Sequence, residues 1–329
     1  MLYIGCYTAE SGGNGTGVTA VREEASGELT RVAELPLTSP SWLTRHPGAP
    51  VLYAAVESAD GAIATIDLER FAVVDTVPSG GASPCHLAVT ADRRFLLCAN
   101  YSSGSLAVFA LAADGRITGR TDLVTHGGGG PDPERQEAAH VHMAVPLDSP
   151  QGTLVSAVDL GTDEIRTYRL SASGTLAPLA VSALPPGTGP RQLLRRPGTD
   201  LAYAAGELNG TVVTVREGPA GTFTTVDVTP ATLTPYDDGP DYVAHLELAG
   251  DRLYVSNRGP DCVTEFDVTD AAPRALADHP CGAFPRHFSL VAGTCHTAAQ
   301  LGDAIVSFPL AGGAPVHFPT GTPTCVIPG

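Results

Sequence analysis

One pattern of apolar and polar positions returns seven times along the chain. Each copy opens with a short apolar run, passes through a polar tight turn, and continues in a second apolar run that ends on a polar residue. The runs are rich in β-forming residues, and no long segment shows the period of a helix. The pattern therefore predicts an all-β chain built from one repeated unit, whose six complete copies lie at 40–57, 84–100, 140–159, 190–207, 242–257 and 285–300.

The seventh copy is divided between the two ends of the chain, at LYIGCY (2–7) and PTCVIPG (323–329). The copies follow one another at about 40 to 55 residues, the period of a four-stranded propeller blade. Pairing the first and last strands in one blade closes a ring and removes two exposed sheet edges. We therefore expect one domain over residues 1–329, a seven-bladed β-propeller closed by its N- and C-terminal strands.

Two connections between copies are longer than the rest, at 120–139 and 228–242. Both are rich in glycine and proline and show little apolar periodicity, so we predict that both are loops. Long loops on a rigid scaffold commonly shape a binding face. His140 and His142 directly follow the first of them.

The composition excludes several kinds of chemistry. The chain contains no lysine, so its 19 basic residues are all arginine. Schiff-base catalysis, a pyridoxal-phosphate lysine and a P-loop lysine are therefore excluded. The net charge of −16 opposes binding to nucleic acid and to anionic membranes, since both need a basic face. It leaves room for a small anionic substrate in a locally basic pocket.

Other features bear on the compartment. We see no signal-peptide pattern and no apolar run of about 18 residues that could span a membrane. The seven cysteines show no zinc-binding spacing and are typical of buried free thiols. We expect a cytoplasmic bacterial protein that is a monomer or a weak homo-oligomer.

The repeat allows equivalent positions to be compared between blades. The starts of the first runs carry a set of polar residues, namely Ser41, His86, His140, His142, Arg191, Arg286 and Thr324. The ends of the second runs carry another set, namely Cys6, Glu57, Asn100, Asp159, Glu207, Asn257 and Gln300. We interpret four members of the second set as residues that bind backbone and fix turns, namely Asn100, Asp159, Asn257 and Gln300. In a propeller the first set faces one axial space.

The candidates for catalysis come from successive blades. They are Arg191 and Glu207 of these sets, Arg258, which directly follows Asn257, and the pair His140 and His142. Burying arginines is costly unless they meet carboxylates or an anionic ligand, and the guanidinium fork suits carboxylate and phosphate. A histidine beside a glutamate supplies a proton acceptor near neutral pH.

The sequence does not decide which of His140 and His142 is the base. Their alternating spacing could also bind a metal, but we prefer the catalytic interpretation and expect neither a metal nor a cofactor. No Ser-His-Asp order, G-x-S-x-G or H-E-x-x-H motif is present. The remaining histidines are interpreted as less informative: His245 as an interior strand residue, and the others as solvated residues of turns or loops, namely His46, His126, His279, His296 and His317.

Several motifs together resemble the seven-bladed lactonase family, which includes bacterial 6-phosphogluconolactonases of the propeller type and fungal carboxy-muconate lactonising enzymes. The motifs extend over the whole chain and are YIGCYT (3–8), GGASPCHLAV (80–89), LLCANYSSGSLAVF (96–109), RQEAAHVHMAV (135–145), DLGTDEIRTYRL (159–170), GTGPRQLL (187–194), YVSNRG (254–259) and PRHF (285–288). The chain departs from the family at Cys6, Ala139 and Gln192, where Thr, Pro and His are usual.

The resemblance implies a catalytic group of His, Arg, Glu and Arg, which falls on His140 or His142, Arg191, Glu207 and Arg258. The expected substrate-binding residues are Arg286, His86, Arg135 and Asn100. The expected function is hydrolysis of a sugar-type lactone in carbohydrate metabolism, most simply of 6-phosphogluconolactone. Two alternatives stay open: a cycloisomerase or lyase of the muconate type, and a propeller that binds a metabolite or protein without catalysis.

Overall fold

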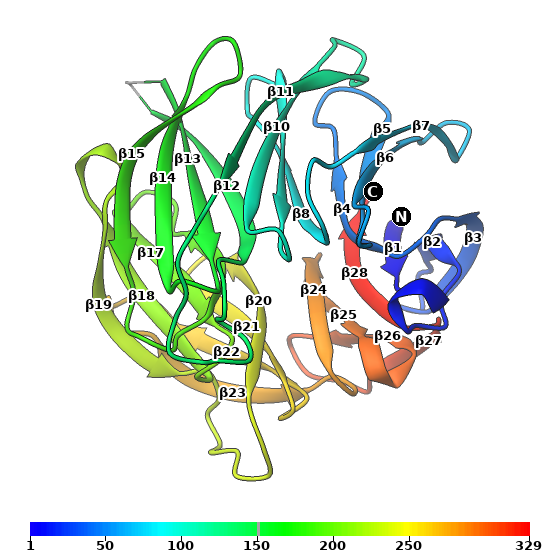
Figure 1. Cartoon of the computed structure of the whole chain (residues 1–329). Helices are drawn as coiled ribbons and strands as arrows, with labels where there is room; N and C mark the ends of the chain where they lie inside the picture. The colour runs from blue at the N-terminus through cyan, green and yellow to red at the C-terminus, as the bar shows by residue number, and fades with distance from the viewer. Residues whose placement is uncertain (150–151) are drawn as a thin grey trace. The chain divides into compact units, whose positions relative to one another are not determined.

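The computed structural model describes residues 1–149 and 152–329. Within these residues the chain forms seven four-stranded sheets, which we number as blades in chain order (Figure 1). The only helices among them are three-residue 3-10 turns at η1 (Ala9–Ser11), η2 (Pro219–Gly221) and η3 (Gln300–Gly302). None of these helices is long and apolar enough to cross a membrane. The fold is the all-β, seven-bladed β-propeller that the sequence predicts.

Each blade takes four strands that follow one another in the chain, except the last. Blades 1 and 2 contain β4 (Pro40–Arg45), β5 (Val51–Val56), β6 (Ala62–Asp67), β7 (Ala72–Pro78), β8 (Pro84–Val89), β9 (Phe95–Asn100), β10 (Ser105–Leu111) and β11 (Ile117–Thr125). Blades 3 and 4 contain β12 (Val141–Ser149), β13 (Gly152–Asp159), β14 (Glu164–Leu170), β15 (Leu176–Ala183), β16 (Pro190–Arg195), β17 (Leu201–Gly206), β18 (Thr211–Glu217) and β19 (Phe223–Pro230). Blades 5 and 6 contain β20 (Tyr242–Ala249), β21 (Arg252–Arg258), β22 (Cys262–Asp267), β23 (Arg274–Pro280), β24 (Pro285–Val291), β25 (Thr294–Ala299), β26 (Ala304–Pro309) and β27 (Val316–Pro319). Blade 7 joins β28 (Pro323–Pro328) to β1 (Leu2–Cys6), β2 (Gly17–Glu23) and β3 (Leu29–Pro36).

Blade 7 is closed by the two ends of the chain, as the split repeat predicts. In the antiparallel pair β28–β1, Leu2 lies opposite Pro328 and Gly5 opposite Cys325. The hydroxyl of Thr324 donates to the carbonyl oxygen of Gly5 at 2.9 Å. Figure 1 shows β28 in red beside β1 in blue. The pairing places β1 inside the sheet, between β28 and β2.

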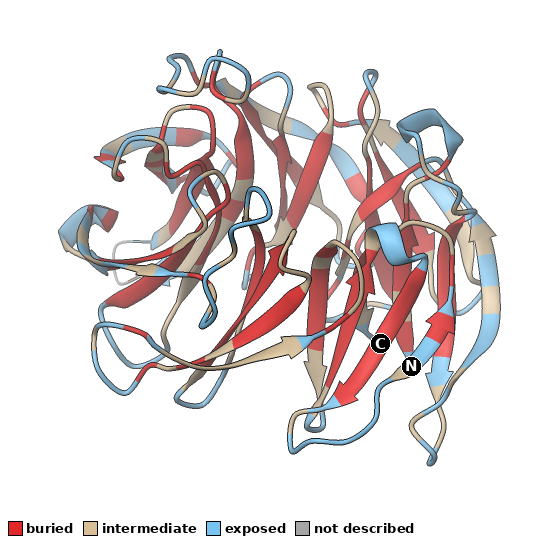
Figure 2. Cartoon of the chain, turned by 90° about the horizontal axis from the view of Figure 1, so that it is seen from below, coloured by how far each residue is buried: buried red, intermediate tan, exposed pale blue. Residues whose placement is uncertain are grey.

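The apolar runs of the repeat correspond to strands that are buried on both faces. Every residue of β5 and of β9 is buried. The fourth strands of the blades alternate instead between exposed and partly buried positions, as in β3 and β7 (Figure 2). A strand packed on both faces reads as a continuous apolar run, whereas an edge strand with one solvated face does not.

This difference explains an error in the loop prediction. Both predicted loops begin inside a fourth strand, because β11 extends to Thr125 and β19 extends to Pro230. The irregular connections therefore cover only 126–140 and 231–241. The apolar pattern of an edge strand is weak, so the last residues of β11 and β19 were predicted to be loop.

The first strand of several blades contains a bulge near its start. The register shifts between Pro84 and His86, between Val141 and Met143, and between Pro285 and His287. The residues left over at these shifts are Cys85, His142 and Arg286. A bulge re-aims the side chain that it carries and is common beside active sites.

The described residues divide into two compact units. The terminal unit contains Met1–Ser41, Leu194–Val215 and Thr225–Gly329, and the middle unit contains Trp42–Leu193 and Arg216–Thr224. The divisions fall inside the strands β4, β16, β18 and β19. The expectation of a single domain stays a prediction.

Candidate functional site

In the middle unit, His142 and Arg191 are in direct contact. His142 occupies the bulge of β12, and Arg191 is the second residue of β16. The Nη1 of Arg191 donates to Nε2 of His142, and each residue is only 5% exposed. Because a guanidinium can only donate, Nε2 must be the unprotonated nitrogen of the ring. The contact therefore holds an imidazole that can accept a proton beside a fixed positive charge.

His140 has different surroundings. Its Nδ1 lies 3.1 Å from the carbonyl oxygen of Tyr101, and its Nε2 lies 3.1 Å from Oε1 of Glu137. The pKa of the Glu137 carboxyl is lowered by a hydrogen bond from its own backbone and by a weaker one from His140, which keeps this acceptor ionised. Both ring nitrogens of His140 thus face acceptors, and a neutral imidazole can donate from only one of them. Neither of these two partners is a donor, in contrast to the partner of Nε2 of His142.

Tyr101 is a site residue that the sequence reasoning missed. Its ring stacks on His140 with centroids 4.4 Å apart and meets His142 edge-on at 5.8 Å. Tyr101 follows Asn100 at the end of β9, just as Arg258 follows Asn257 in β21. Comparing the residue after each polar strand end would have identified it.

In the terminal unit, Glu207 and Arg258 form a buried ion pair. The Nη2 of Arg258 lies 2.9 Å from Oε2 of Glu207, and both side chains are 5% exposed. The Nε of Arg258 donates to the carbonyl oxygen of Tyr242 at 3.0 Å. The guanidinium also lies over the rings of Phe284, at 5.2 Å, and Tyr242, at 5.9 Å. Charge, hydrogen bonding and cation–π contact together immobilise it.

Asp241 is a second acidic group that the sequence reasoning did not identify. It ends the connection 231–241 and immediately precedes β20. Burial raises the pKa of its carboxyl to about 7, although the charge of Arg258 opposes the shift. Among the described residues, Oδ1 of Asp241 has no hydrogen-bond partner. No feature of the sequence around Asp241 indicates this burial.

The expected substrate-binding residues have separate surroundings. In the terminal unit, the guanidinium of Arg286 lies 5.1 Å from the ring centroid of Tyr7. In the middle unit, the ring of His86 lies 4.5 Å from that of Trp42. Asn100 is buried and its Nδ2 donates to the Ser105 hydroxyl at 3.2 Å, inside blade 2. Arg135 lies half-buried in the connection 126–140. Their roles toward a substrate stay predictions.

The interpretation of the other histidines was wrong for three of them. His46, His126 and His296 are buried rather than solvated. His126 bonds Asp159, and His296 lies on β25 and bonds the Ser307 hydroxyl at 2.8 Å. His126 directly follows the edge strand β11 and so resembles a loop residue in the sequence, yet it is buried against Asp159 of the next blade. His245 is an interior residue of β20, as expected.

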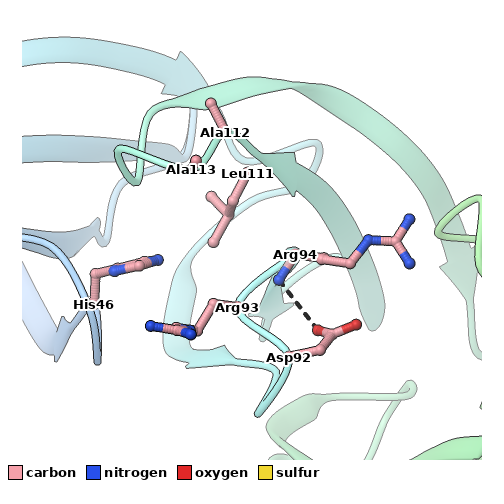
Figure 3. Close-up of a pocket in the computed structure, with 7 residues that line it drawn as sticks. All are labelled: His46, Asp92, Arg93, Arg94, Leu111, Ala112 and Ala113. Carbon is pink, nitrogen blue, oxygen red and sulfur yellow. Dashed lines mark hydrogen bonds between the residues drawn. The ribbon is translucent and has the colours of Figure 1, made fainter.

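A cavity of about 360 Å³ lies elsewhere in the middle unit (Figure 3). The ring of His46 and the guanidinium of Arg93 face the same space in that view. Burial, followed by the charge of Arg93, lowers the pKa of His46. The lining contains none of the candidate catalytic or substrate-binding residues; it consists of His46, Asp92, Arg93, Arg94, Leu111, Ala112 and Ala113.

All seven cysteines are free and buried, as expected from their spacing. Burial raises the pKa of the Cys6 and Cys262 thiols to about 11, so neither is a ready nucleophile. Within the described residues, no group of three or more His, Cys, Asp or Glu side chains is arranged to hold a metal ion.

Comparison with known proteins agrees with this fold. The family model for "Lactonase, 7-bladed beta-propeller" matches residues 1–310. A 6-phosphogluconolactonase of Bacillus subtilis is 31% identical over 276 residues, which cover 81% of this chain and 77% of the relative. A 6-phosphogluconolactonase of Formosa agariphila is 26% identical over 306 residues, which cover 88% of this chain and 86% of the relative.

Two solved structures are also similar over almost the whole chain. A periplasmic gluconolactonase of Pseudomonas aeruginosa has a TM-score of 0.89 at 26% identity, with 99% of this chain and 98% of that chain covered. A putative 6-phosphogluconolactonase of Bacteroides fragilis has a TM-score of 0.85 at 26% identity, with 99% and 96% covered. These similarities support lactone hydrolysis in general terms. The chain belongs to the seven-bladed β-propeller lactonase family.

Proposed function

We propose that this protein hydrolyses 6-phosphogluconolactone to the open acid without a metal or organic cofactor. Family membership supports lactone hydrolysis, and the relatives named 6-phosphogluconolactonase favour this substrate. The arginine side chains suit a phosphorylated sugar lactone, because guanidinium groups bind phosphate through two parallel hydrogen bonds. The net charge of −16 does not oppose this, since Arg191 and Arg258 are each buried on a strand.

In the proposed reaction, His142 is the general base. It takes a proton from the attacking water and returns it to the ring oxygen of the lactone as the ester bond breaks. This role goes to His142 rather than His140 because Nε2 of His142 meets a donor and is therefore an acceptor nitrogen, whereas both nitrogens of His140 face acceptors. His140 and Tyr101 would hold the segment that carries His142.

Arg191 has two roles in this proposal. In the free protein its Nη1 donates a hydrogen bond to the lone pair on Nε2 of His142. An anionic group of the substrate competes for the guanidinium, because a charge-assisted pair with phosphate or with a developing oxyanion is stronger than a bond to a neutral imidazole. Substrate binding thereby releases Nε2 of His142 for the water. A phosphorylated lactone should therefore be a better substrate than its unphosphorylated counterpart.

We propose further that Arg258 and Glu207 take part in the same reaction, as the family resemblance implies. Arg258 would bind an anionic oxygen of the substrate or transition state, and Glu207 would hold the guanidinium and share in proton transfer. Arg286 would bind the phosphate. Within the terminal unit, the burial of the Glu207–Arg258 pair supports this role. Burying two charges costs desolvation free energy, and a catalytic role accounts for keeping them there.

The observation that carries the proposal is the contact between Arg191 and His142 in a member of this family. The test is whether purified protein opens 6-phosphogluconolactone faster than the spontaneous rate, measured by acid release at constant pH. Arg191→Gln should lower kcat/KM for the phosphorylated lactone far more than for gluconolactone. Arg169→Gln, on β14, is the control and should change neither. Loss of activity toward both lactones in equal proportion would contradict the role given to Arg191.

The same assay in heavy-oxygen water distinguishes hydrolysis from isomerisation. Hydrolysis places one solvent oxygen in the product carboxylate, whereas a cycloisomerase introduces none. An accelerated reaction without label would reject the hydrolytic proposal.

A further inference from the structure

Asp159 joins three segments of the middle unit through hydrogen bonds. Its Oδ2 lies 2.7 Å from Nδ1 of His126, and both side chains are fully buried. Its Oδ1 accepts the backbone N–H of His140 at 2.8 Å and that of Gly161 at 3.1 Å. The hydroxyl of Tyr168 lies 2.9 Å from Nε2 of His126. We call Asp159, His126 and Tyr168 the buried triad.

The hydrogen bonds of the buried triad have a defined direction. A carboxylate only accepts, so Nδ1 of His126 carries a proton, and in the neutral ring Nε2 accepts from Tyr168. Burial by itself would raise the pKa of Asp159, but the hydrogen bonds from His126 and from the His140 backbone outweigh it and lower that pKa. Asp159 is therefore a charged group held in the interior.

Blades 2 and 5 place an uncharged residue at the position of Asp159. Asn100 and Asn257 occupy the position of Asp159 in their blades, since each lies opposite the residue that precedes the register shift of the first strand; the pairs are Pro84–Asn100, Val141–Asp159 and Val243–Asn257. Asn257 donates to the carbonyl oxygen of Ala231 at 3.1 Å and to the Thr264 hydroxyl at 2.9 Å. A neutral amide thus suffices to hold this position, and it costs less to bury than a carboxylate.

His126 is likewise unusual at its position. Its backbone N–H donates to the carbonyl of Gly104 across the blade. The equivalent bonds in other blades are made by residues without an ionisable imidazole, namely Leu37, Ser79, Leu184, Ala231, Cys281 and Thr320. Among the described residues that make this bond, only His126 places an imidazole against the acidic residue of the next blade.

The buried triad holds the backbone on the N-terminal side of the candidate base, His142. Asp159 pairs with Val141, the residue just before the bulge that carries His142. It also holds the N–H of His140, the residue before Val141. Any shift of the Asp159 side chain must therefore move the backbone that aims both imidazoles.

We infer that Asp159, His126 and Tyr168 are positioning residues that set the backbone of the His140–His142 segment for catalysis. The inference rests on the proposed function, because it assigns the role of His142 in lactone hydrolysis. It adds a role for three residues that act through the backbone N–H of His140 and through the bulge. A displacement of this kind lowers kcat more than it weakens substrate binding.

The test is a double-mutant cycle on Asp159 and His126. His126→Phe keeps the ring volume but leaves Asp159 as a buried charge without its imidazole partner, so we expect kcat to fall about tenfold with KM within about twofold. Asp159→Asn added to His126→Phe copies the neutral amide of blades 2 and 5 and should restore most of the loss. The amide signals of His140 and His142, followed by NMR, should shift in the single variant and return in the double variant.

Tyr53→Phe is the matched control for a lost buried hydrogen bond. Tyr53 is fully buried in the same unit and donates its hydroxyl to the carbonyl of Gly115. Its variant should lose stability and keep kcat. A comparable fall in kcat for Tyr53→Phe, or a loss in His126→Phe that Asp159→Asn leaves unchanged, would overturn the inference.

Two further outcomes are informative. If His126→Phe does not fold, Tyr168→Phe removes a single hydroxyl from the triad; it should lower kcat about threefold and shift the His140 amide, and no change in either would overturn the inference. If the wild-type protein opens no lactone, the proposed function fails. The His140 and His142 amides then decide the positioning claim alone, because unshifted signals in His126→Phe reject it.

Discussion

The carboxylate of Glu207 lies 2.9 Å from the guanidinium of Arg258, and each side chain is only 5% exposed. Removing one partner of such a pair leaves an uncompensated charge in the interior. Glu207→Gln should therefore lower the free energy of unfolding by about 3–5 kcal/mol. Denaturant unfolding followed by fluorescence measures the change.

The control is an exposed ion pair in the same unit. Arg31 and Glu34 lie 2.8 Å apart, with 44% and 39% of their side chains exposed. Glu34→Gln should cost at most about 1 kcal/mol, because water and salt screen the pair. Equal losses in the two variants would contradict the importance assigned to burial of the Glu207–Arg258 pair.

His142, on β12, and His140, just before β12, should contribute differently to catalysis. His142→Gln removes the acceptor nitrogen, and loss of a general base commonly lowers the rate by about 10²–10⁴-fold. His140→Gln can still donate to the Tyr101 carbonyl and should retain at least about a tenth of kcat. Initial rates of lactone opening, corrected for the spontaneous reaction, separate the two. If His140→Gln is the more damaging variant, the base has been assigned to the wrong ring.

The closure of blade 7 should depend on a glycine. A side-chain carbon at Gly5 would lie 2.3 Å from the carbonyl oxygen of Pro40 and 2.8 Å from the sulfur of Cys325. Gly5→Ala must therefore push backbone apart beside the β28–β1 pair, at a cost of about 1–3 kcal/mol. Gly127→Ala is the control, since an added carbon there meets no atom within 4 Å. Thermal unfolding should show a lower midpoint for Gly5→Ala alone.

The contribution of Glu247 to stability should fall as the pH rises from mildly acidic to mildly alkaline. Burial raises the pKa of Glu247 to about 7, although hydrogen bonds from Leu290 and Ser289 oppose the shift. The folded state thus binds this proton more tightly than the unfolded state, whose glutamate pKa is about 4.3. The stabilisation is present below the unfolded pKa and is lost as the pH rises through about 7.

Glu247→Gln should reduce this slope. Denaturant unfolding at about pH 5.5 and about pH 8 gives the comparison. Asp241, whose pKa is also raised to about 7, keeps part of the slope in the variant. Glu265→Gln, which removes a carboxylate 3.1 Å from Arg252, is the control and should keep the full slope. A slope unchanged by Glu247→Gln would show that this carboxyl does not titrate in that range.

Local pattern was sufficient to predict the architecture. Strands packed on both faces must be apolar at every position, so the runs around Val51–Val56 and Phe95–Asn100 are visible without coordinates. The split of the seventh repeat likewise predicted the β28–β1 pair. Edge strands carry a weaker pattern because one face is solvated, and for that reason the ends of β11 and β19 were mistaken for loops.

For the candidate site, too, the sequence predicted some features and missed others. Residue type and repeat position were enough to select His142, Arg191, Glu207 and Arg258 from the sequence. They could not show which ring nitrogen is an acceptor, because that depends on what each nitrogen touches: His142 meets Arg191, 49 residues away, whereas His140 meets Tyr101, 39 residues away.

The sequence by itself determined the strands, their repeat and the types of side chain that are available for chemistry, since these follow from periodicity and composition. Only the tertiary structure decided that His126 is buried against Asp159 and that Glu207 neutralises Arg258. The physical reason is that hydrogen bonds and ion pairs form between side chains that the backbone brings together from different blades. Burial then sets their charge state, and no local stretch of sequence records it.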